Sequence, residues 1–269
     1  MGGDEEREMT MAKRSDRSWF ALVAVAGVVS CAGTPAGAAT VVLSPSQDNA
    51  LIQEPDGLLS DGAGPHFYVG RTTQTEAFRL RRGLIAFDVS TIPAGATIDS
   101  VTLALSMSRT VETFVPVDRA IAMHRVLASW GEGASNSGTP GGGGAPAQTG
   151  DATWLHRTYS GALWSAPGGD FNPTASATTL VGLIGSYSWT SAQLASDVQG
   201  WLAAPGTNFG WELIGDESTN GTARRFDSRT NPEIGARPTL TVTYSVPEPG
   251  GLGMVIVGTY VWCRRRRGR

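Results

Sequence analysis

Two stretches decide how this chain folds: Gly83-Leu84-Ile85-Ala86-Phe87-Asp88-Val89 and, further on, Val101-Thr102-Leu103-Ala104-Leu105-Ser106-Met107. In both, one set of apolar residues alternates with a second set, and a period of two places the sets on opposite faces of a β-strand. The intervening residues 90–96 contain a proline and a glycine, which end a strand and let the chain cross to another sheet. Such strands bury an apolar face only against an opposing sheet, so the sequence predicts a β-sandwich.

The same alternation recurs along the chain. Further strands are expected at residues 40–43, 66–70, 120–130, 209–213, 224–229 and 239–244. Between residues 189 and 201 the period changes: Leu194, Val198 and Trp201 share one face of a short helix that closes one end of the sandwich, and Ser191 is its expected N-cap. The predicted fold is therefore an all-β antiparallel sandwich with one short helix, in a single domain at residues 39–245.

Composition agrees with many short strands and turns, because the 269 residues include 35 glycines and 15 prolines. Residues 133–150, with four consecutive glycines at 141–144, can bury little, and we expect a surface loop there. The region 39–249 holds 12 arginines, no lysine and 19 acidic residues, a formal charge of −7. This balance argues against nucleic acid as a partner, which calls for a basic surface.

The N-terminal residues have the pattern of an export signal. After Met11, a basic segment at residues 13–17 precedes an apolar core at 19–32, and Ala36-Gly37-Ala38 fits a cleavage site. We therefore expect residues 1–38 to be a signal peptide that signal peptidase removes. The alternative is a lipoprotein signal, because Val28-Val29-Ser30-Cys31 resembles a processing box in which Cys31 is lipidated.

The C-terminus has three parts: Val246-Pro247-Glu248-Pro249, a mostly apolar segment at residues 250–263, and four arginines at 264–267. This order resembles the PEP-CTERM sorting signal of exported bacterial proteins, which would occupy residues 246–269. The resemblance implies transient membrane anchoring, cleavage by a membrane-embedded exosortase, and a host that makes an exopolysaccharide matrix. The alternative is a plain anchor without processing; the apolar segment is shorter than the roughly 20 residues of a straight membrane-spanning helix.

Several short motifs, in order along the chain, resemble those of DNRLRE domains, which are also classed as carbohydrate-binding modules of family ninety-six. The motifs are Asp48-Asn49 with Leu51 and Glu54, Arg82-Gly83-Leu84-Ile85-Ala86-Phe87-Asp88, Ile92-Pro93-Ala94-Gly95-Ala96, Trp130-Gly131-Glu132-Gly133, Gly150-Asp151-Ala152-Thr153-Trp154, Arg225-Phe226-Asp227-Ser228-Arg229 and Arg237-Pro238-Thr239-Leu240. The resemblance implies a jelly-roll sandwich that accompanies enzymes acting on acidic polysaccharides. This sequence differs from the namesake hexapeptide, with Ala50 and Ile52 near the arginine positions and one extra residue before Glu54.

Oxygen-bearing side chains gather in two parts of the chain and suggest a structural calcium ion. Calcium takes about six to eight oxygen ligands, and a bound ion would suit an exported domain whose expected mature region has no cysteine. The candidate ligands are Asp48, Glu54, Asp56, Asp61, Asp216 and Glu217. The alternative is that these side chains cap their own backbone in turns.

Arginines and tryptophans are the candidate ligand-binding residues. A guanidinium matches the carboxylates or sulfates of an acidic polysaccharide, and an exposed indole stacks on a sugar ring. We expect an extracellular polysaccharide as the partner, bound by Arg79, Arg81, Arg224, Arg229, Trp154 and Trp164. Since neighbouring strand residues face opposite ways, at most half of each arginine cluster shares one surface. The alternatives are structural: ion pairs joining Arg82 and Arg225 to nearby aspartates, and burial of the tryptophans.

Together these features predict an exported, non-catalytic protein of the cell surface that binds carbohydrate or associates with an extracellular matrix. A first alternative is a polysaccharide lyase or hydrolase on the same scaffold, in which His156 with Asp151 or Glu132 supplies acid and base. The spacing of these residues does not itself indicate such a site. A second alternative is a structural surface protein with no defined ligand.

Overall fold

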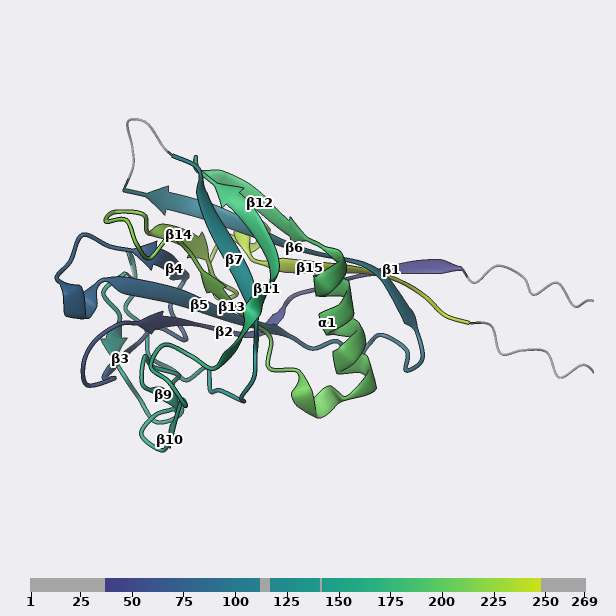
Figure 1. The fold of residues 1–269 in the computed structure, drawn as a ribbon, viewed down its shortest axis with the longest axis horizontal. Helices are drawn as coiled ribbons and strands as arrows, with labels where there is room; N and C mark the ends of the chain where they lie inside the picture. The colour runs from purple at the N-terminus through teal and green to yellow at the C-terminus, as the bar shows by residue number, and fades with distance from the viewer. Residues whose placement is uncertain (1–36, 112–116, 141, 248–269) are drawn as a thin grey trace, which may run out of the picture. The chain divides into compact units, whose positions relative to one another are not determined.

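The computed structural model describes residues 37–111, 117–140 and 142–247. Most described strands belong to one large antiparallel sheet that curls on itself (Figure 1). The order across it is β1 (Ala38–Leu43), β15 (Thr239–Ser245), β6 (Thr97–Thr110), β14 (Arg224–Asp227), β4 (His66–Arg71), β5 (Leu80–Phe87), β13 (Trp211–Ile214), β7 (Arg119–Val126) and β11 (Phe171–Val181). In addition, β12 (Gly185–Thr190) pairs with β6, and β2 (Pro45–Ile52) pairs with β5.

The remaining elements are short. Two small sheets join β3 (Leu59–Ser60) to β8 (Ala145–Pro146) and β9 (His156–Thr158) to β10 (Ala162–Leu163). Helical segments are η1 (Glu76–Phe78), α1 (Ala192–Ala203), η2 (Pro205–Thr207) and η3 (Ile234–Ala236). Within the described ranges α1 is the one α-helix, so the prediction of a mostly β, antiparallel protein with one short helix is confirmed there.

Several strand boundaries differ from the expected ones for local reasons. The strand expected at 120–130 ends at Val126, since the chain then turns so that the Trp130 indole can donate to the Phe209 carbonyl (2.8 Å). Phe209 lies outside β13 because Gly210, with φ of 73°, separates it from the strand. The alternation of apolar residues did not predict β11 and β12. β11 begins Phe-Asn-Pro-Thr and has few large apolar residues.

The curled sheet faces itself across one core. Phe67, Phe87, Trp189, Trp211 and Phe226 are fully or almost fully buried there, and they come from five strands of both halves of the sheet. Trp189 and Phe226 meet edge to face at 6.0 Å, an arrangement that the ring quadrupoles favour. Burying large aromatic side chains removes much apolar area from water, which is the main favourable term in folding.

Both faces of β5 are buried, whereas a typical sandwich strand exposes one face to solvent. Leu84 and Ala86 point away from the main core into a second one, formed with Trp130, Trp154 and Trp164. The segment after β7 carries these tryptophans and folds back over the sheet. Burial on both faces explains why residues 84–87 of β5 are all buried.

Helix α1 closes the main core beside β6 and β11. The Ser191 hydroxyl accepts the Leu194 N–H at 2.9 Å, so the expected N-cap is confirmed. Leu194, Val198 and Trp201 are fully buried, and the Trp201 ring lies 4.5 Å from that of Trp211. The predicted apolar face of the helix therefore packs as expected.

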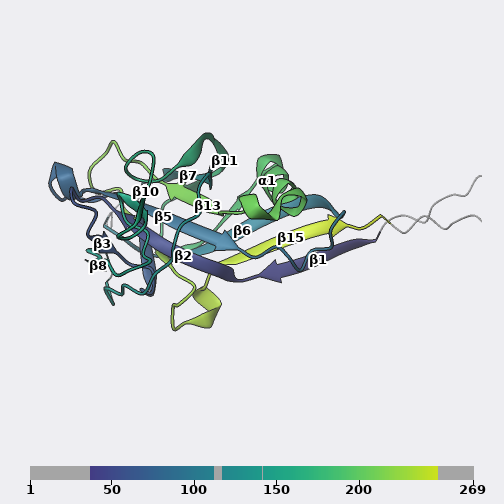
Figure 2. The same cartoon turned by 90° about the horizontal axis from the view of Figure 1, so that it is seen from below.

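The two ends of the described chain lie side by side. Ala38 of β1 is opposite Ser245 of β15 in the sheet register. Figure 2 shows the β1–β15 pair at one end of this body and β3 and β8 at the other. The first and last described strands are therefore neighbours in the sheet.

Candidate functional site

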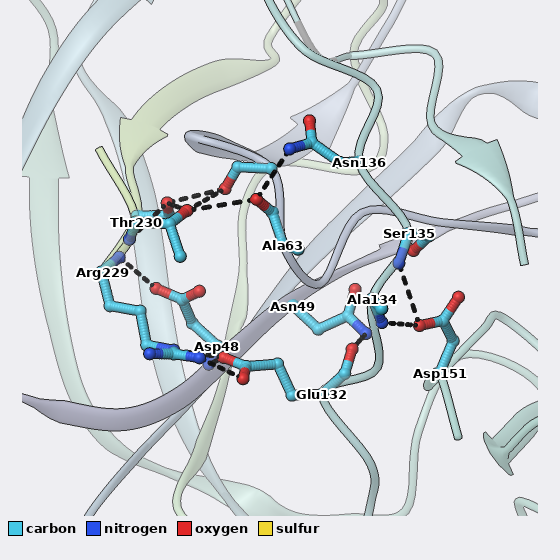
Figure 3. Close-up of polar contacts among 12 residues, drawn as sticks. Asp48, Asn49, Ala63, Glu132, Ala134, Ser135, Asn136, Asp151, Arg229 and Thr230 are labelled. Carbon is cyan, nitrogen blue, oxygen red and sulfur yellow. Dashed lines mark hydrogen bonds and ion pairs between the residues drawn. The ribbon is translucent and has the colours of Figure 1, made fainter. Parts of the chain in front are cut away.

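Four segments far apart in the sequence meet around Asp48 and Asn49 of β2 (Figure 3). The Asn49 amide nitrogen donates to the carbonyls of Glu132 (2.8 Å) and Ala152 (3.2 Å). Its oxygen accepts from the Ser60 hydroxyl (3.0 Å). One buried amide thus ties β2 to β3 and to two loops, as buried polar groups that are fully hydrogen-bonded can do.

Arg229 joins the same assembly from beyond the end of β14. Its guanidinium makes two hydrogen bonds to the Glu132 carboxylate, and its main-chain N–H donates to Asp48 Oδ2 at 2.6 Å. Burial raises the pKa of Asp48 to about 7, because desolvation disfavours the charged carboxylate. We call Asp48, Asn49, Glu132, Asp151 and Arg229 the β2 node.

The glycine-rich loop is held by Asp151 of the node and by Asp61. Asp61 accepts the N–H and the hydroxyl of Ser137 (2.8 and 2.7 Å), while Asp151 accepts the N–H groups of Ala134 (2.8 Å) and Gln148 (2.6 Å). A Cβ on Gly133, whose φ is 74°, would lie only 1.4 Å from Asp151 Oδ1, so this close approach requires glycine. The predicted surface loop is therefore fastened to the body near both of its ends.

The predicted calcium ligands are spread over separate contacts. Glu54 accepts the N–H groups of Asp56 (3.0 Å) and Leu58, as the turn-capping alternative expects. Asp216 pairs with an arginine of β7 (3.1 Å) and Glu217 pairs with an arginine of β5 (2.7 Å). Over the described ranges no three His, Cys, Asp or Glu side chains are grouped to hold a metal. A calcium ion stays a prediction.

Most of the predicted ligand-binding residues serve the fold. Arg224 is fully buried and donates to the carbonyls of Thr222 and Val117, and Arg79 pairs with Glu76. The indoles of Trp154 and Trp164 are more than nine-tenths buried in the second core. With Arg229 paired in the β2 node, five of the six side chains contact other residues of the protein, and the ion pairs of Arg79 and Arg229 are partly exposed.

Arg81, the sixth, is buried beneath a surface groove. Its guanidinium donates to the carbonyls of Gly142 (2.9 Å) and Phe78 (2.8 Å) and to the Gln74 side chain (3.0 Å). Burial lowers its pKa to about 10, so the side chain stays charged at neutral pH. Arg81 thereby joins η1 to the glycine-rich loop and forms the floor between them.

This groove consists of two hollows of about 310 and 350 Å³, which share Gln74 and Gly143. The side chains that give it its chemistry are Tyr68, Thr72, Thr73, Gln74, Thr75, Phe78, Arg81 and Arg109, and we call it the polar groove. Its described lining contains no acidic residue. The charged residues of its described lining are both arginines, a composition that suits anionic ligands.

The polar groove offers three kinds of contact. The rings of Tyr68 and Phe78 provide flat apolar surface, and Phe78 is 41% exposed. Arg109 is exposed and has no ion-pair partner in the described chain, so its guanidinium is free to meet an anion. Threonine hydroxyls supply donors and acceptors for ligand hydroxyl groups.

A third hollow, of about 340 Å³, lies beyond Thr139. His66, Ser108, Thr139, Arg225, Asp227 and Glu233 line it, and we call it the His66 hollow. His66 Nε2 lies 3.4 Å from Asp227 Oδ1, which also accepts the Ser108 hydroxyl (2.7 Å). Burial lowers the pKa of His66, which favours the neutral ring. Since Ser108 donates to Asp227 and not to His66, these side chains do not form a nucleophile–base relay.

Arg225 connects the two depressions. In the sheet register it lies opposite Tyr68 of β4 and opposite Arg109 of β6. Tyr68 and Arg109 line the polar groove and Arg225 lines the His66 hollow, so both depressions open on the outer face of β4, β14 and β6.

The sequence contained a signal for this surface. Phe226 is apolar and faces the core, so alternation turns Arg224 inward with it and Arg225 outward. The expectation that each arginine cluster divides between two faces is confirmed for this pair, but the predicted binding residue was the inward Arg224. Tyr68 was missed because it lies between the apolar Phe67 and Val69, and Arg109 because it is a lone charge at the end of a strand.

The acid–base pair considered for an enzyme is not assembled from the expected residues. His156 Nδ1 lies 3.1 Å from the Thr153 hydroxyl, and its ring meets Tyr159 edge to face. Glu132 is bound to Arg229, and Asp151 holds loop N–H groups. The structure brings a histidine and a carboxylate together in a hollow at His66 and Asp227 instead.

No protein-family model matches the chain, and no curated protein matches it. In the described part, no helix has the length and apolar character to cross a membrane. Most of the expected signal peptide lies outside the described residues, including Cys31; only its last two residues, Gly37 and Ala38, are described. Of the expected sorting signal, Val246 and Pro247 directly follow β15, whereas Glu248 and Pro249 lie outside the described residues.

Proposed function

We propose that this protein is an exported, non-catalytic polysaccharide-binding protein that holds an acidic extracellular polymer in the polar groove. One observation carries the proposal: an open groove combines exposed aromatic surface, threonine hydroxyls and Arg109. Among the described residues Arg109 has no ion-pair partner, and the lining contains no acidic side chain. Stacking surface suits sugar rings, hydroxyls suit their polar edges, and a guanidinium suits a uronate or sulfate.

We further propose that the body is a jelly-roll domain of the DNRLRE type. Support comes from the β2 node, where four of the motifs behind the resemblance meet: Asp48-Asn49, the segment around Glu132, the segment around Asp151, and the segment ending at Arg229. If the resemblance reflects a shared fold, we expect its motifs to meet in one hydrogen-bond network although they are distant in sequence. Chance similarity carries no such expectation.

The proposal includes export and sorting through the two ends: a signal peptide at residues 1–38 and a PEP-CTERM signal at residues 246–269, with exosortase as processing partner. Ala38 and Ser245 are register partners at the end away from β3 and β8 (Figure 2). The polar groove includes Leu59 of β3 in its lining. A protein held to a membrane by either end would therefore leave the groove free for a matrix polymer.

The test is retention of the purified full-length protein on immobilised polysaccharides: carboxylated, sulfated and neutral. We expect retention on at least one acidic polymer, weakened by salt, and none on the neutral polymer. Arg109→Gln should weaken binding about tenfold or more, the usual effect of losing a charge-assisted hydrogen bond. Arg157→Gln, which removes a partly exposed arginine outside the groove, is the matched control. Equal retention of both variants would refute the groove as the binding site.

A second candidate function is cleavage of such a polymer, because His66 and Asp227 meet in an open hollow beside Arg225. A neutral histidine next to a carboxylate can act as a general base. The same incubations separate the two functions when released reducing ends and unsaturated products are measured. Release that His66→Gln abolishes would establish an enzyme, and neither retention nor release would favour a structural surface protein without a ligand.

A further inference from the structure

The polar groove and the His66 hollow differ in the sign of their charge. In the groove, Arg109 is exposed and Arg81 underlies the floor, with no acidic residue among the described lining. In the hollow, Arg225 is outnumbered by the carboxylates of Asp227 and Glu233, and burial favours the neutral form of His66. Two neighbouring depressions of opposite charge recognise ligand groups of different charge.

Both depressions are accessible to one polymer chain. Thr139 lines the hollow and the next residue, Pro140, lines the groove. On the sheet beneath them, Arg225 of the hollow is the direct neighbour of Tyr68 and Arg109 of the groove, and directly opposed residues on adjacent strands lie about 5 Å apart. This spacing is within the reach of adjacent sugar rings in a chain.

Glu233 is the exposed carboxylate of the hollow. Its side chain is exposed, and no described residue forms an ion pair with it. Asp227, by contrast, already accepts the Ser108 hydroxyl and faces His66. A uronate placed here would lie close to an uncompensated carboxylate, whereas a hydroxyl or amide N–H of an uncharged sugar can donate to it.

From these contacts we infer that the ligand is a heteropolysaccharide in which an anionic sugar adjoins an uncharged one, the anionic sugar in the polar groove and the uncharged sugar in the His66 hollow. The inference rests on the proposed function and adds the substrate class. It assigns Glu233 a selective role, that of excluding polymers in which every sugar is charged.

The experiment compares the full-length protein and its variants on three kinds of soluble polymer by affinity electrophoresis at fixed ionic strength. The first kind alternates a uronate with an N-acetylated sugar, as hyaluronan and unsulfated chondroitin do; the second is a pure polyuronate; the third is neutral dextran. We expect the alternating polymers to bind about tenfold tighter than the polyuronate, since opposed like charges are costly. Thermal unfolding of each variant verifies that it is folded.

Two variants separate this inference from the proposed function. Glu233→Gln should raise affinity for the polyuronate severalfold and leave the alternating polymers almost unchanged, whereas Arg109→Gln should weaken both. If polyuronate already binds as tightly as the alternating polymers, or if Glu233→Gln leaves their ratio unchanged, the heteropolymer inference is overturned while the acidic-polymer function stands. If no acidic polymer binds, or if only dextran binds, the proposed function itself fails.

Discussion

At the scale of single residues, an arginine shared between two carboxylates occurs twice. Arg82 pairs with the partly exposed Glu217 (2.7 Å) and reaches the buried Glu212 at 3.3 Å. Within the described ranges Glu212 Oε2 has no hydrogen-bond partner, and burial raises the pKa of Glu212 to about 8. In the β2 node, Arg229 pairs with the partly exposed Glu132 and also lies next to the buried Asp48, whose pKa is raised. In each case the arginine neutralises the more exposed carboxylate, and the buried one retains a proton at higher pH.

Glu212→Gln should reveal that proton through the pH dependence of stability. The folded pKa of Glu212, about 8, lies above its ordinary value of 4.5, so between these values the folded state binds the additional proton. Stability of the native protein therefore falls as the pH rises from about 4.5 to 8, and glutamine, which resembles the protonated acid, removes this loss. Melting temperatures measured from pH 5 to 9 should show the variant gaining on the native protein. Parallel curves would mean that Glu212 is ionised throughout.

At the scale of elements, α1 depends on a single hydroxyl at its start. The Ser191 hydroxyl accepts the Leu194 N–H and donates to the Ser176 carbonyl of β11, so it both caps the helix and fastens it to the sheet. The apolar face of α1 then covers the core next to Trp211.

Ser191→Ala should reduce the free energy of unfolding by about 1 to 2 kcal/mol, the usual cost of losing a serine cap. Ser196→Ala is the control, because Ser196 is an exposed residue inside the helix, where alanine is the better helix former. Urea unfolding of both variants checks the difference. A Ser191 variant as stable as the Ser196 variant would show that packing alone holds the helix.

At the scale of the whole molecule, the β2 node joins one edge of the sheet to the glycine-rich loop. Its contacts link β2, the loops at Glu132 and Asp151, and the chain beyond β14 (Figure 3). The same loop borders the polar groove through Pro140 and Gly142. The node therefore holds a wall of the groove although no node residue lines the groove itself.

Arg229→Met should destabilise the protein by about 1 to 3 kcal/mol, since it leaves Glu132 and the buried Asp48 without their cation while the pair is partly solvent-screened. Combining it with Glu132→Gln should cost less than the sum of the two single losses, because both variants remove the same interaction. Denaturant unfolding of the single and double variants measures the coupling. Strictly additive losses would show that the two side chains are not coupled.

The sequence by itself determined the elements whose pattern is strong and local. Alternation over β5 and β6, the change of period at α1 and the Ser191 cap depend on neighbouring residues, so they can be recognised along the chain. Trp130, Trp201 and Trp211 are buried, as the large apolar area of an indole favours. β11 and β12 lacked such a pattern, and partner strands decided their conformation.

Only the tertiary structure decided which polar residues form the surface. Arg81, Arg224 and Arg229 are as polar as Arg109 and Arg225, but loop carbonyls and carboxylates from distant segments enclose the first three. The groove exists because η1, β4, β6 and the glycine-rich loop meet there. Contacts between residues so far apart in the chain depend on how the whole sheet curls, and no short window of sequence contains that information.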